Sequence, residues 1–218
     1  DGIRDVERSR GLGDVYKRQL QEWIKQRKPL MRCILVILAS VLSAMAVNAN
    51  EHSISAYDFS FKTISGEPLP FSEFRGKVVM VVNTASECGF TGQYKNLQTV
   101  WSRYRDKGFV VLGVPSNDFG NQEPGEEAQI KSFCEVNFDV DFPLTTKVQV
   151  TGDDAHPFYL WASNELGLLA KPRWNFHKYL VGTNGQLVDW FSTPTSPTSG
   201  KITKAIENHL SKTSIEDK

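Results

Sequence analysis

The sequence predicts an α/β domain with a central mixed sheet flanked by helices. Residues 77–84 and 109–114 are short, continuous runs of β-branched and other apolar residues, a pattern typical of strands buried on both faces. A pattern of apolar residues at helical spacing lies between these two runs, and a hairpin pattern followed by another helical pattern closes the chain. Strands that alternate with helices favour a layered α/β architecture.

The first half of the domain is predicted to run strand, helix, strand. Alternating aromatic residues over 57–61 predict a short entry strand. The run 77–84 leads into a helix, for which Thr91 is the expected N-cap and Gly108 the expected stop. The apolar face of this helix consists of Tyr94, Leu97, Trp101 and Tyr104. The strand at 77–84, this helix and the strand at 109–114 together predict a βαβ unit with two parallel strands.

The second half is predicted to end in a strand, strand, helix arrangement. A helix over about 126–136 comes first, and its apolar face carries Ile130, Phe133 and Cys134. After a polar connection, residues 176–181 and 186–191 predict a hairpin around Asn184-Gly185. An amphipathic helix over roughly 199–210 follows. This order of elements is that of a thioredoxin-like fold.

The first 49 residues differ from the rest of the chain. No methionine precedes Met31, and residues 1–30 are charged without a sustained apolar period, so we interpret them as a non-native or upstream segment. Residues 31–49 combine Arg32, an apolar run and small residues before a cleavage box, the pattern of a signal peptide. The run of about 15 apolar residues is shorter than the roughly 20 of a membrane-spanning helix.

From this N-terminal pattern we expect an exported protein, periplasmic or secreted, without stable membrane insertion. A retained N-terminal anchor is the alternative. Residues 50–218 are then left as one domain. They hold 16 basic and 20 acidic side chains with no basic stripe, which argues against a nucleic-acid partner. The four scattered histidines have no zinc-site spacing, and we assign them neither metal binding nor catalysis.

Cys88 is the sharpest chemical feature of the sequence. It follows the buried strand directly and precedes a helix N-terminus, where backbone N–H groups and the helix dipole favour a thiolate. A thiolate is the nucleophile that peroxides oxidise, so the position predicts a reactive cysteine. The structural alternative is a small core hydrophobe. The flanking Glu87 and Gly89 suit a loop better than a packed interior.

Four segments of the chain resemble the glutathione peroxidase family. The sequence around Cys88, Asn83-Thr-Ala-Ser-Glu-Cys-Gly-Phe-Thr91, is similar to the signature of the family's catalytic cysteine or selenocysteine. Residues 112–125 and 174–181 resemble its second and third signatures, and 153–157 a further family-like block. The matches fall in the family's order over roughly residues 54–210, which makes them far more specific together than singly.

The resemblance implies a site of four residues. Family members surround the reactive residue with a glutamine, a tryptophan and an asparagine, and the matching positions are Gln122, Trp174 and Asn175. Amide and indole N–H donors at these positions stabilise the thiolate and the oxyanion that leaves as the O–O bond breaks. Without the resemblance, Gln122 would be interpreted as a turn residue and Trp174 as a core aromatic.

Cys134 matches the position at which thioredoxin-dependent members of the family carry a resolving cysteine. It lies 46 positions after Cys88. The resemblance implies that a sulfenic acid on Cys88 condenses with this thiol to a redox-active disulfide, which a thioredoxin-like protein or glutathione then reduces; no cofactor is implied. The alternative is a buried structural cysteine, because Ile130 and Phe133 share its helix face. A buried resolving cysteine would require local opening of the helix.

Two departures from the family pattern affect these expectations. Ser116-Asn117-Asp118 stands where many relatives carry Cys-Asn-Gln, and an inward-pointing carboxylate there would disfavour the thiolate. Only 16 residues separate Pro157 from Trp174, so the loop of tetrameric, glutathione-specific members is short. By resemblance we expect a monomer with an open site for hydrogen peroxide and for organic or lipid hydroperoxides.

A peroxide sensor and a periplasmic disulfide donor are the rival functions, and the absence of Cys-x-x-Cys weighs against the latter.

Overall fold

The computed structural model of the protein describes residues 17–23, 25 and 53–216. The chain separates into two compact units, 1–53 and 54–218. In the first unit, the described residues 17–23 and 25 are helical and exposed. The predicted signal peptide at 31–49 and most of the segment 1–30 lie outside the described residues. Among the residues that are described, no helix is both long and apolar enough to cross a membrane.

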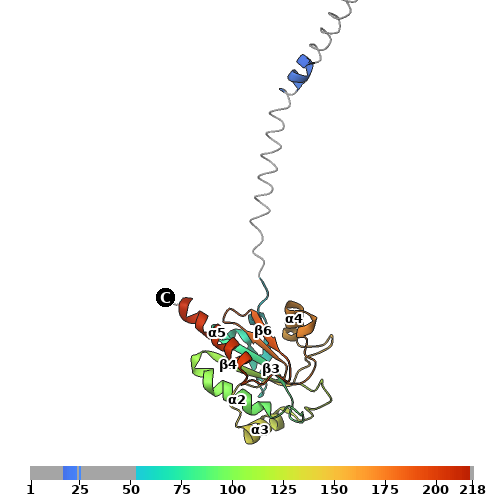
Figure 1. Ribbon diagram of the computed structural model, residues 1–218. Helices are drawn as coiled ribbons and strands as arrows, with labels where there is room; N and C mark the ends of the chain where they lie inside the picture. The colour runs from blue at the N-terminus through green and yellow to red at the C-terminus, as the bar shows by residue number, and fades with distance from the viewer. Residues whose placement is uncertain (1–16, 24, 26–52, 217–218) are drawn as a thin grey trace, which may run out of the picture. The chain divides into compact units, whose positions relative to one another are not determined.

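The second unit is built on a four-stranded mixed sheet with the strand order β4-β3-β5-β6 (Figure 1). Its strands are β3 (Val78–Thr84), β4 (Phe109–Pro115), β5 (Lys178–Val181) and β6 (Leu187–Phe191). β3 and β4 are parallel, whereas β5 pairs antiparallel with both β3 and β6. The predicted mixed sheet, its parallel βαβ unit and its hairpin are therefore confirmed.

Alternate residues of β3 point into two separate cores, which explains why the run at 77–84 lacks a polar alternation. One face of the sheet packs against α2 (Gln93–Tyr104), α3 (Glu127–Phe138) and α5 (Gly200–Glu216). The opposite face packs against α4 (Pro157–Leu166) (Figure 1). All seven residues of β3 are buried. This three-layer arrangement confirms helices on both sides of the sheet.

The N-terminal entry segment differs from its prediction. A strand over 57–61 was expected, but Ala56–Asp58 form a 3₁₀ helix and the strand β1 covers Ser60–Lys62. The Asp58 carboxylate accepts a hydrogen bond from the backbone N–H of Ser55 at 2.8 Å, which closes this turn. β1 pairs antiparallel with β2 (Pro68–Pro70) in a separate two-stranded sheet.

The polar connection expected before the hairpin contains the helix α4. Pro157 occupies its first turn, where a missing N–H costs nothing, and the His156 ring nitrogen Nδ1 accepts the backbone N–H of Phe158 at 3.3 Å. Phe158, Tyr159 and Trp161 are buried against the sheet. The helix was missed because its apolar residues crowd into one turn and show little helical spacing.

Candidate active site

Cys88 lies in the irregular segment between the end of β3 and the start of α2. The hydroxyl oxygen of Thr91 accepts the backbone N–H of Cys88 at 3.0 Å. The same hydroxyl lies 2.7 Å from the carbonyl oxygen of Cys88 and 3.0 Å from that of Ala85, within donating distance of both. Thr91 therefore organises the Cys88 segment rather than capping α2 as expected, and Gly92 occupies the N-cap position.

Cys88 is a buried residue at the N-terminal end of a helix, and it belongs to the core cluster that also contains Cys134. Its side chain is 7% exposed, while the neighbouring Gly89 and Phe90 are exposed. The Sγ atom accepts a hydrogen bond from the backbone N–H of Phe90, with a donor–acceptor distance of 3.4 Å. α2 begins at Gln93, so its positive end also faces this segment. The thiol therefore meets a backbone N–H donor at the N-terminal end of α2.

Hydrogen bonds join Gln122 to Asn175 and to the residue beside Cys88. The Nδ2 group of Asn175 donates to Oε1 of Gln122 at 3.0 Å. The backbone N–H of Glu87 donates to the carbonyl oxygen of Gln122, also at 3.0 Å. Segments around residues 88, 122 and 175 are therefore tied together at the end of β3, where the sequence resemblance places one site.

Trp174 and Asn175 are neighbours in the chain but have opposite environments. Trp174 is 39% exposed and packs against Phe119, with ring centroids 5.9 Å apart. It is thus a surface side chain beside the site, and not the core aromatic that the bare sequence suggested. Asn175 is fully buried, and its Oδ1 has no hydrogen-bond partner among the described residues. Its Nδ2 is the atom that contacts Gln122.

Asn83 holds the Trp174–Asn175 segment against β3, a role that the sequence reasoning did not assign. Its Nδ2 donates to the carbonyl oxygen of Trp174 at 3.2 Å, and its Oδ1 accepts the backbone N–H of His177 at 3.0 Å. Its backbone carbonyl accepts the N–H of Phe176 at 2.6 Å. Phe176 has a φ of 62°, a left-handed conformation that is uncommon for a bulky residue. These contacts offset the strain at Phe176.

Cys134 occupies a different environment from the other predicted site residues. It lies on α3 and is fully buried in the core shared with α2. Burial raises the pKa of its thiol to about 11, and the carboxylates of Glu123 and Glu135 act in the same direction, while the Tyr94 hydroxyl lowers it. Cys88 and Cys134 are both free thiols in the structure.

The carboxylate of Asp118 is directed at a neighbouring loop. Its Oδ2 accepts the backbone N–H groups of Val150 and Thr151 at 2.6 and 2.9 Å. The hydroxyl of Thr151 lies 3.2 Å from the same oxygen. The side chain that departs from the family pattern therefore anchors the 150–151 loop, and the inward orientation that would act on the Cys88 thiol is not adopted.

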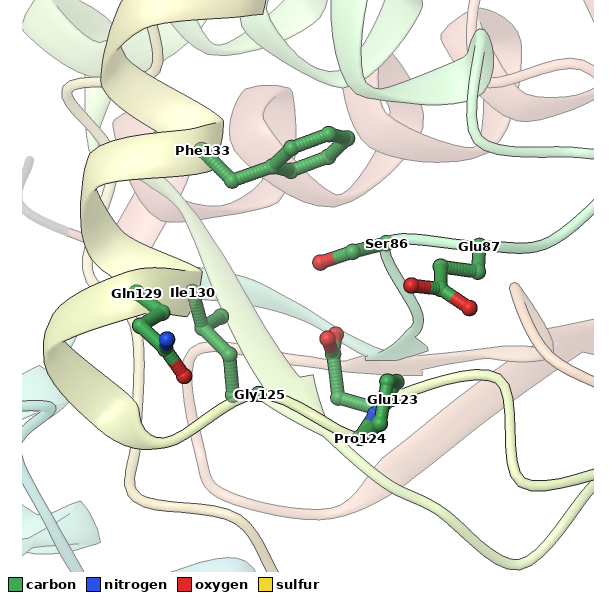
Figure 2. A pocket seen from close by; sticks show the side chains of 8 residues that line it. All are labelled: Ser86, Glu87, Glu123, Pro124, Gly125, Gln129, Ile130 and Phe133. Atoms are coloured by element: carbon green, nitrogen blue, oxygen red, sulfur yellow. The ribbon is translucent and has the colours of Figure 1, made fainter.

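A cavity of about 410 Å³ lies between the Cys88 segment and α3 (Figure 2). Ser86 and Glu87 line one side, Ile130 and Phe133 of α3 line another, and Glu123 lies between them. Glu123 follows Gln122 directly, yet sequence reasoning gave it no role. Only its burial, which the sequence does not reveal, sets it apart from a surface acid.

Comparison with known proteins identifies the family. The glutathione peroxidase family model matches residues 56–163. The chain is 46% identical over 144 residues to a glutathione peroxidase-like peroxiredoxin, gpx1, of Schizosaccharomyces pombe. The aligned region covers 65% of this chain and 90% of that protein. It is 42% identical over 161 residues to the hydroperoxy fatty acid reductase gpx1 of Synechocystis, which covers 70% of this chain and 94% of the relative.

Solved structures agree with these relatives. The structure described as "Crystal structure of Trgpx in apo form" superposes with a TM-score of 0.60 and 37% identity, covering 73% of this chain and 97% of that one. A thioredoxin-family thiol:disulfide interchange protein from Chlorobium tepidum, 16% identical, superposes with a TM-score of 0.55 over 74% of this chain and 99% of its own. The predicted thioredoxin-like fold is thereby confirmed. At 46% identity over nine-tenths of a curated relative, the chain belongs to the glutathione peroxidase family and is a peroxidase.

Proposed function

We propose that the protein reduces hydrogen peroxide and organic or lipid hydroperoxides with the thiolate of Cys88. The sulfur attacks one peroxide oxygen, an S–O bond forms, and the O–O bond breaks. The leaving oxyanion takes up a proton and departs as water or an alcohol, which leaves Cys88 as a sulfenic acid. Two electrons pass from the sulfur to the peroxide in this step.

The observation that carries this proposal is the hydrogen-bonded link between the Cys88 segment, Gln122 and Asn175. Glu87 donates to the Gln122 backbone and Asn175 to its side chain, so both amides are held at the end of β3 where Cys88 lies. Trp174, which precedes Asn175 in the chain and packs against Phe119, is proposed to add an indole N–H donor to the site. Neutral donors of this kind stabilise a developing oxyanion without repelling an uncharged hydroperoxide. The name of the Synechocystis relative, a hydroperoxy fatty acid reductase, supports lipid hydroperoxides as one substrate class.

In the second half of the proposed cycle, Cys134 attacks the Cys88 sulfenic acid. An S–S bond forms, the S–O bond breaks and water leaves. A dithiol protein of the thioredoxin type, or glutathione, then reduces the disulfide and is itself oxidised. Because Cys134 is fully buried on α3, this step requires local opening of the helix before the two sulfurs meet.

The test is stopped-flow oxidation of the reduced full chain by hydrogen peroxide and by a fatty acid hydroperoxide, with mass spectrometry of the products. Wild type is expected to form an intramolecular disulfide, and Cys134→Ser is expected to stop at a sulfenic acid on Cys88. Oxidation no faster than that of a free thiol would refute the proposed peroxidase mechanism. Fast oxidation without turnover by any dithiol would instead indicate a peroxide sensor.

Export and a monomeric state belong to the same proposal. The pattern at 31–49 supports export, and the short connection between Pro157 and Trp174 supports a monomer. Expression of the full chain in a bacterium, followed by cell fractionation, tests export, and an N-terminus near residue 50 in the exported fraction is the expected result. Light scattering of the protein from that fraction measures its molar mass, and the mass of a single chain is the expected result. Retention of the intact chain in the membrane fraction would favour the anchor instead.

A further inference from the structure

A buried carboxyl group borders the space between the two cysteine-bearing segments. Glu123 is fully buried, and neither of its carboxylate oxygens makes a hydrogen bond of ordinary geometry among the described residues, although the Ser86 hydroxyl and backbone N–H lower the pKa of the group. Figure 2 shows its carboxyl group directed toward the Ser86 hydroxyl, across the cavity from Phe133. An unpaired buried carboxyl group costs free energy and calls for an explanation beyond packing.

Further unpaired polar groups extend from this carboxyl group toward Cys134. The hydroxyls of Ser86, Thr84 and Tyr94 are buried and make no hydrogen bond of ordinary geometry among the described residues, although Ser86 acts on Glu123, and Thr84 and Cys134 act on Tyr94. Thr84 and Cys134 both influence the ionisation of the Tyr94 hydroxyl, and burial together with Cys134 raises the pKa of Tyr94 well above its usual value. A set of polar atoms therefore leads from the end of β3, through the interior, to the Cys134 thiol.

The cavity is bordered by the two segments that carry the cysteines, although neither cysteine lines it. Ser86 and Glu87 immediately precede Cys88, while Ile130 and Phe133 lie on the turn of α3 that precedes Cys134. A thiol that leaves the core when α3 opens moves toward the Cys88 segment through this space. Glu123 is the carboxyl group buried beside that path, and its charge already acts on Cys134 in the closed structure.

The ionisation of Glu123 suits proton exchange near neutral pH. Burial raises the pKa of its carboxyl group to about 7, and Glu87 acts in the same direction. Ser86 and Lys147 oppose this shift, and the Lys147 ammonium donates to the carbonyl oxygens of Glu123 and Gly125. From α3 and α2, Cys134, Glu135 and Tyr94 face the same region. A thiol whose pKa is about 11 needs a proton acceptor, and groups with pKa values near the working pH are the most effective.

We propose that Glu123 accepts the proton of the Cys134 thiol when Cys134 attacks the Cys88 sulfenic acid. The Cys134 S–H bond breaks, its proton passes to the Glu123 carboxylate, and the thiolate forms the S–S bond. The hydroxide released from Cys88 then takes the proton from Glu123 and leaves as water. The step consumes one thiol and one sulfenic acid and yields one disulfide and one water. This inference rests on the proposed Cys88–Cys134 chemistry.

The experiment separates oxidation of Cys88 from disulfide formation. Reduced full chain is mixed with hydrogen peroxide, and tryptophan fluorescence is followed: the peroxide-dependent phase reports oxidation, and the peroxide-independent phase reports the disulfide. Glu123→Gln is compared with wild type over a range of pH around 7. Glu135→Gln is the matched control, because Glu135 also raises the pKa of Cys134 but is exposed on α3.

In wild type and Glu135→Gln, the rate of the peroxide-independent phase is expected to rise with pH, with a midpoint near 7. In Glu123→Gln this rate is expected to fall about 100-fold above the midpoint and to lose the midpoint. Glu123→Asp, which keeps a carboxyl group and guards against a folding defect in the first variant, is expected to restore the midpoint in part. An unchanged rate and midpoint in Glu123→Gln, or a defect confined to the peroxide-dependent phase, would overturn the inference. Absence of any disulfide in wild type would instead overturn the proposed function on which it rests.

Discussion

The two cysteines of the domain share a core cluster but differ in almost every property that governs thiol chemistry. Cys88 lies in an irregular segment, and its sulfur accepts a backbone N–H at the N-terminal end of α2. Cys134 lies on a regular helix, is fully buried, and has a pKa raised to about 11. The first environment offers the sulfur a backbone N–H donor, and the second keeps the proton on the sulfur.

This difference matches the two roles that we propose, in which Cys88 reacts with the peroxide and Cys134 forms the disulfide. A cysteine that meets the peroxide must be ionised and reachable in the resting protein. A cysteine that forms the disulfide must stay unreactive until the first has been oxidised, since a second reactive thiolate would itself be consumed by peroxide. Burial on α3 supplies that restraint, and opening of the helix removes it.

The largest expected effect is a difference in alkylation rate between the two thiols. In the reduced full chain, iodoacetamide is expected to modify Cys88 at least about 100-fold faster than Cys134, because Cys134 reacts only after α3 opens. Mass spectrometry of the modified peptides over time measures both rates in one sample. In denaturant the two rates should converge. Equal rates in the native protein would show that α3 does not shield Cys134.

Removing one donor of the site is expected to affect oxidation and not alkylation. Asn175→Ala should slow the reaction of Cys88 with hydrogen peroxide by about 100-fold, because an oxyanion donor acts on the transition state. Alkylation of Cys88 by iodoacetamide should change far less. Stopped-flow kinetics measure the first rate, and Asn208→Ala, an exposed amide on α5, is the control. Because Asn175 bonds to Gln122, Gln122→Ala combined with Asn175→Ala should cost less than the product of the single effects.

The raised pKa of Glu123 predicts a pH-dependent stability difference. Below its ordinary value of 4.5, the carboxyl group is protonated in both the folded and the unfolded protein; between 4.5 and about 7 only the folded protein keeps the proton. The stability of wild type therefore falls as pH rises through this window. Glu123→Gln, which cannot ionise, should exceed wild type by on the order of 2 kcal/mol above pH 7 and by little at low pH.

Denaturant unfolding of both proteins at several pH values measures this difference. The titration of other buried groups, such as His177 and Lys178, is common to both proteins and largely cancels. A difference in the free energy of unfolding that does not change with pH would show that Glu123 is charged, or exposed, in the folded chain. That result would also contradict the interpretation of Glu123 as a buried carboxyl group that keeps its proton up to about pH 7.

The smallest expected effect is that of Asp118→Asn. The change weakens the acceptor for the N–H groups of Val150 and Thr151, and it should cost about 1 kcal/mol in the free energy of unfolding. Oxidation of Cys88 by peroxide should stay within about two-fold of wild type, because the carboxylate is directed at the 150–151 loop. A clear acceleration in stopped-flow experiments would instead indicate that Asp118 acts on the Cys88 thiol.

Much of the fold could be predicted from the sequence because its strands and helices carry strong local patterns. The apolar run that becomes β3 and the turn at Asn184-Gly185 are signals of this kind. The helix α4 was missed, although Pro157 after His156 marks its start, because most of its apolar residues are consecutive and show little helical spacing. Thr91 was misassigned as a cap because its hydroxyl oxygen accepts the backbone N–H of Cys88. No local sequence pattern reveals this contact.

The site was predictable only in part from local chemistry. The position of Cys88 between strand and helix follows from physical reasoning, whereas Gln122, Trp174 and Asn175 were located by resemblance to the family. Asn83 and Glu123 were assigned no role. Their significance lies in burial and in contacts between distant segments, which are properties of the folded chain. The polar Asn83 directly follows the apolar run of β3, and this position was the one local sign that the residue has a role of its own.

The contacts of Asn83 have a consequence for the synthesis of the protein. Its partners at Trp174 and His177 lie 91 and 94 residues later in the sequence. A ribosome that has translated Cys88 must therefore add 86 further residues to reach Trp174 and 89 to reach His177 before Asn83 acquires these partners. Until then, the nascent chain carries Cys88 without the segment at 174–177 that Asn83 holds against β3 in the folded molecule. The contacts that join this segment to β3 therefore form long after the first strands can fold.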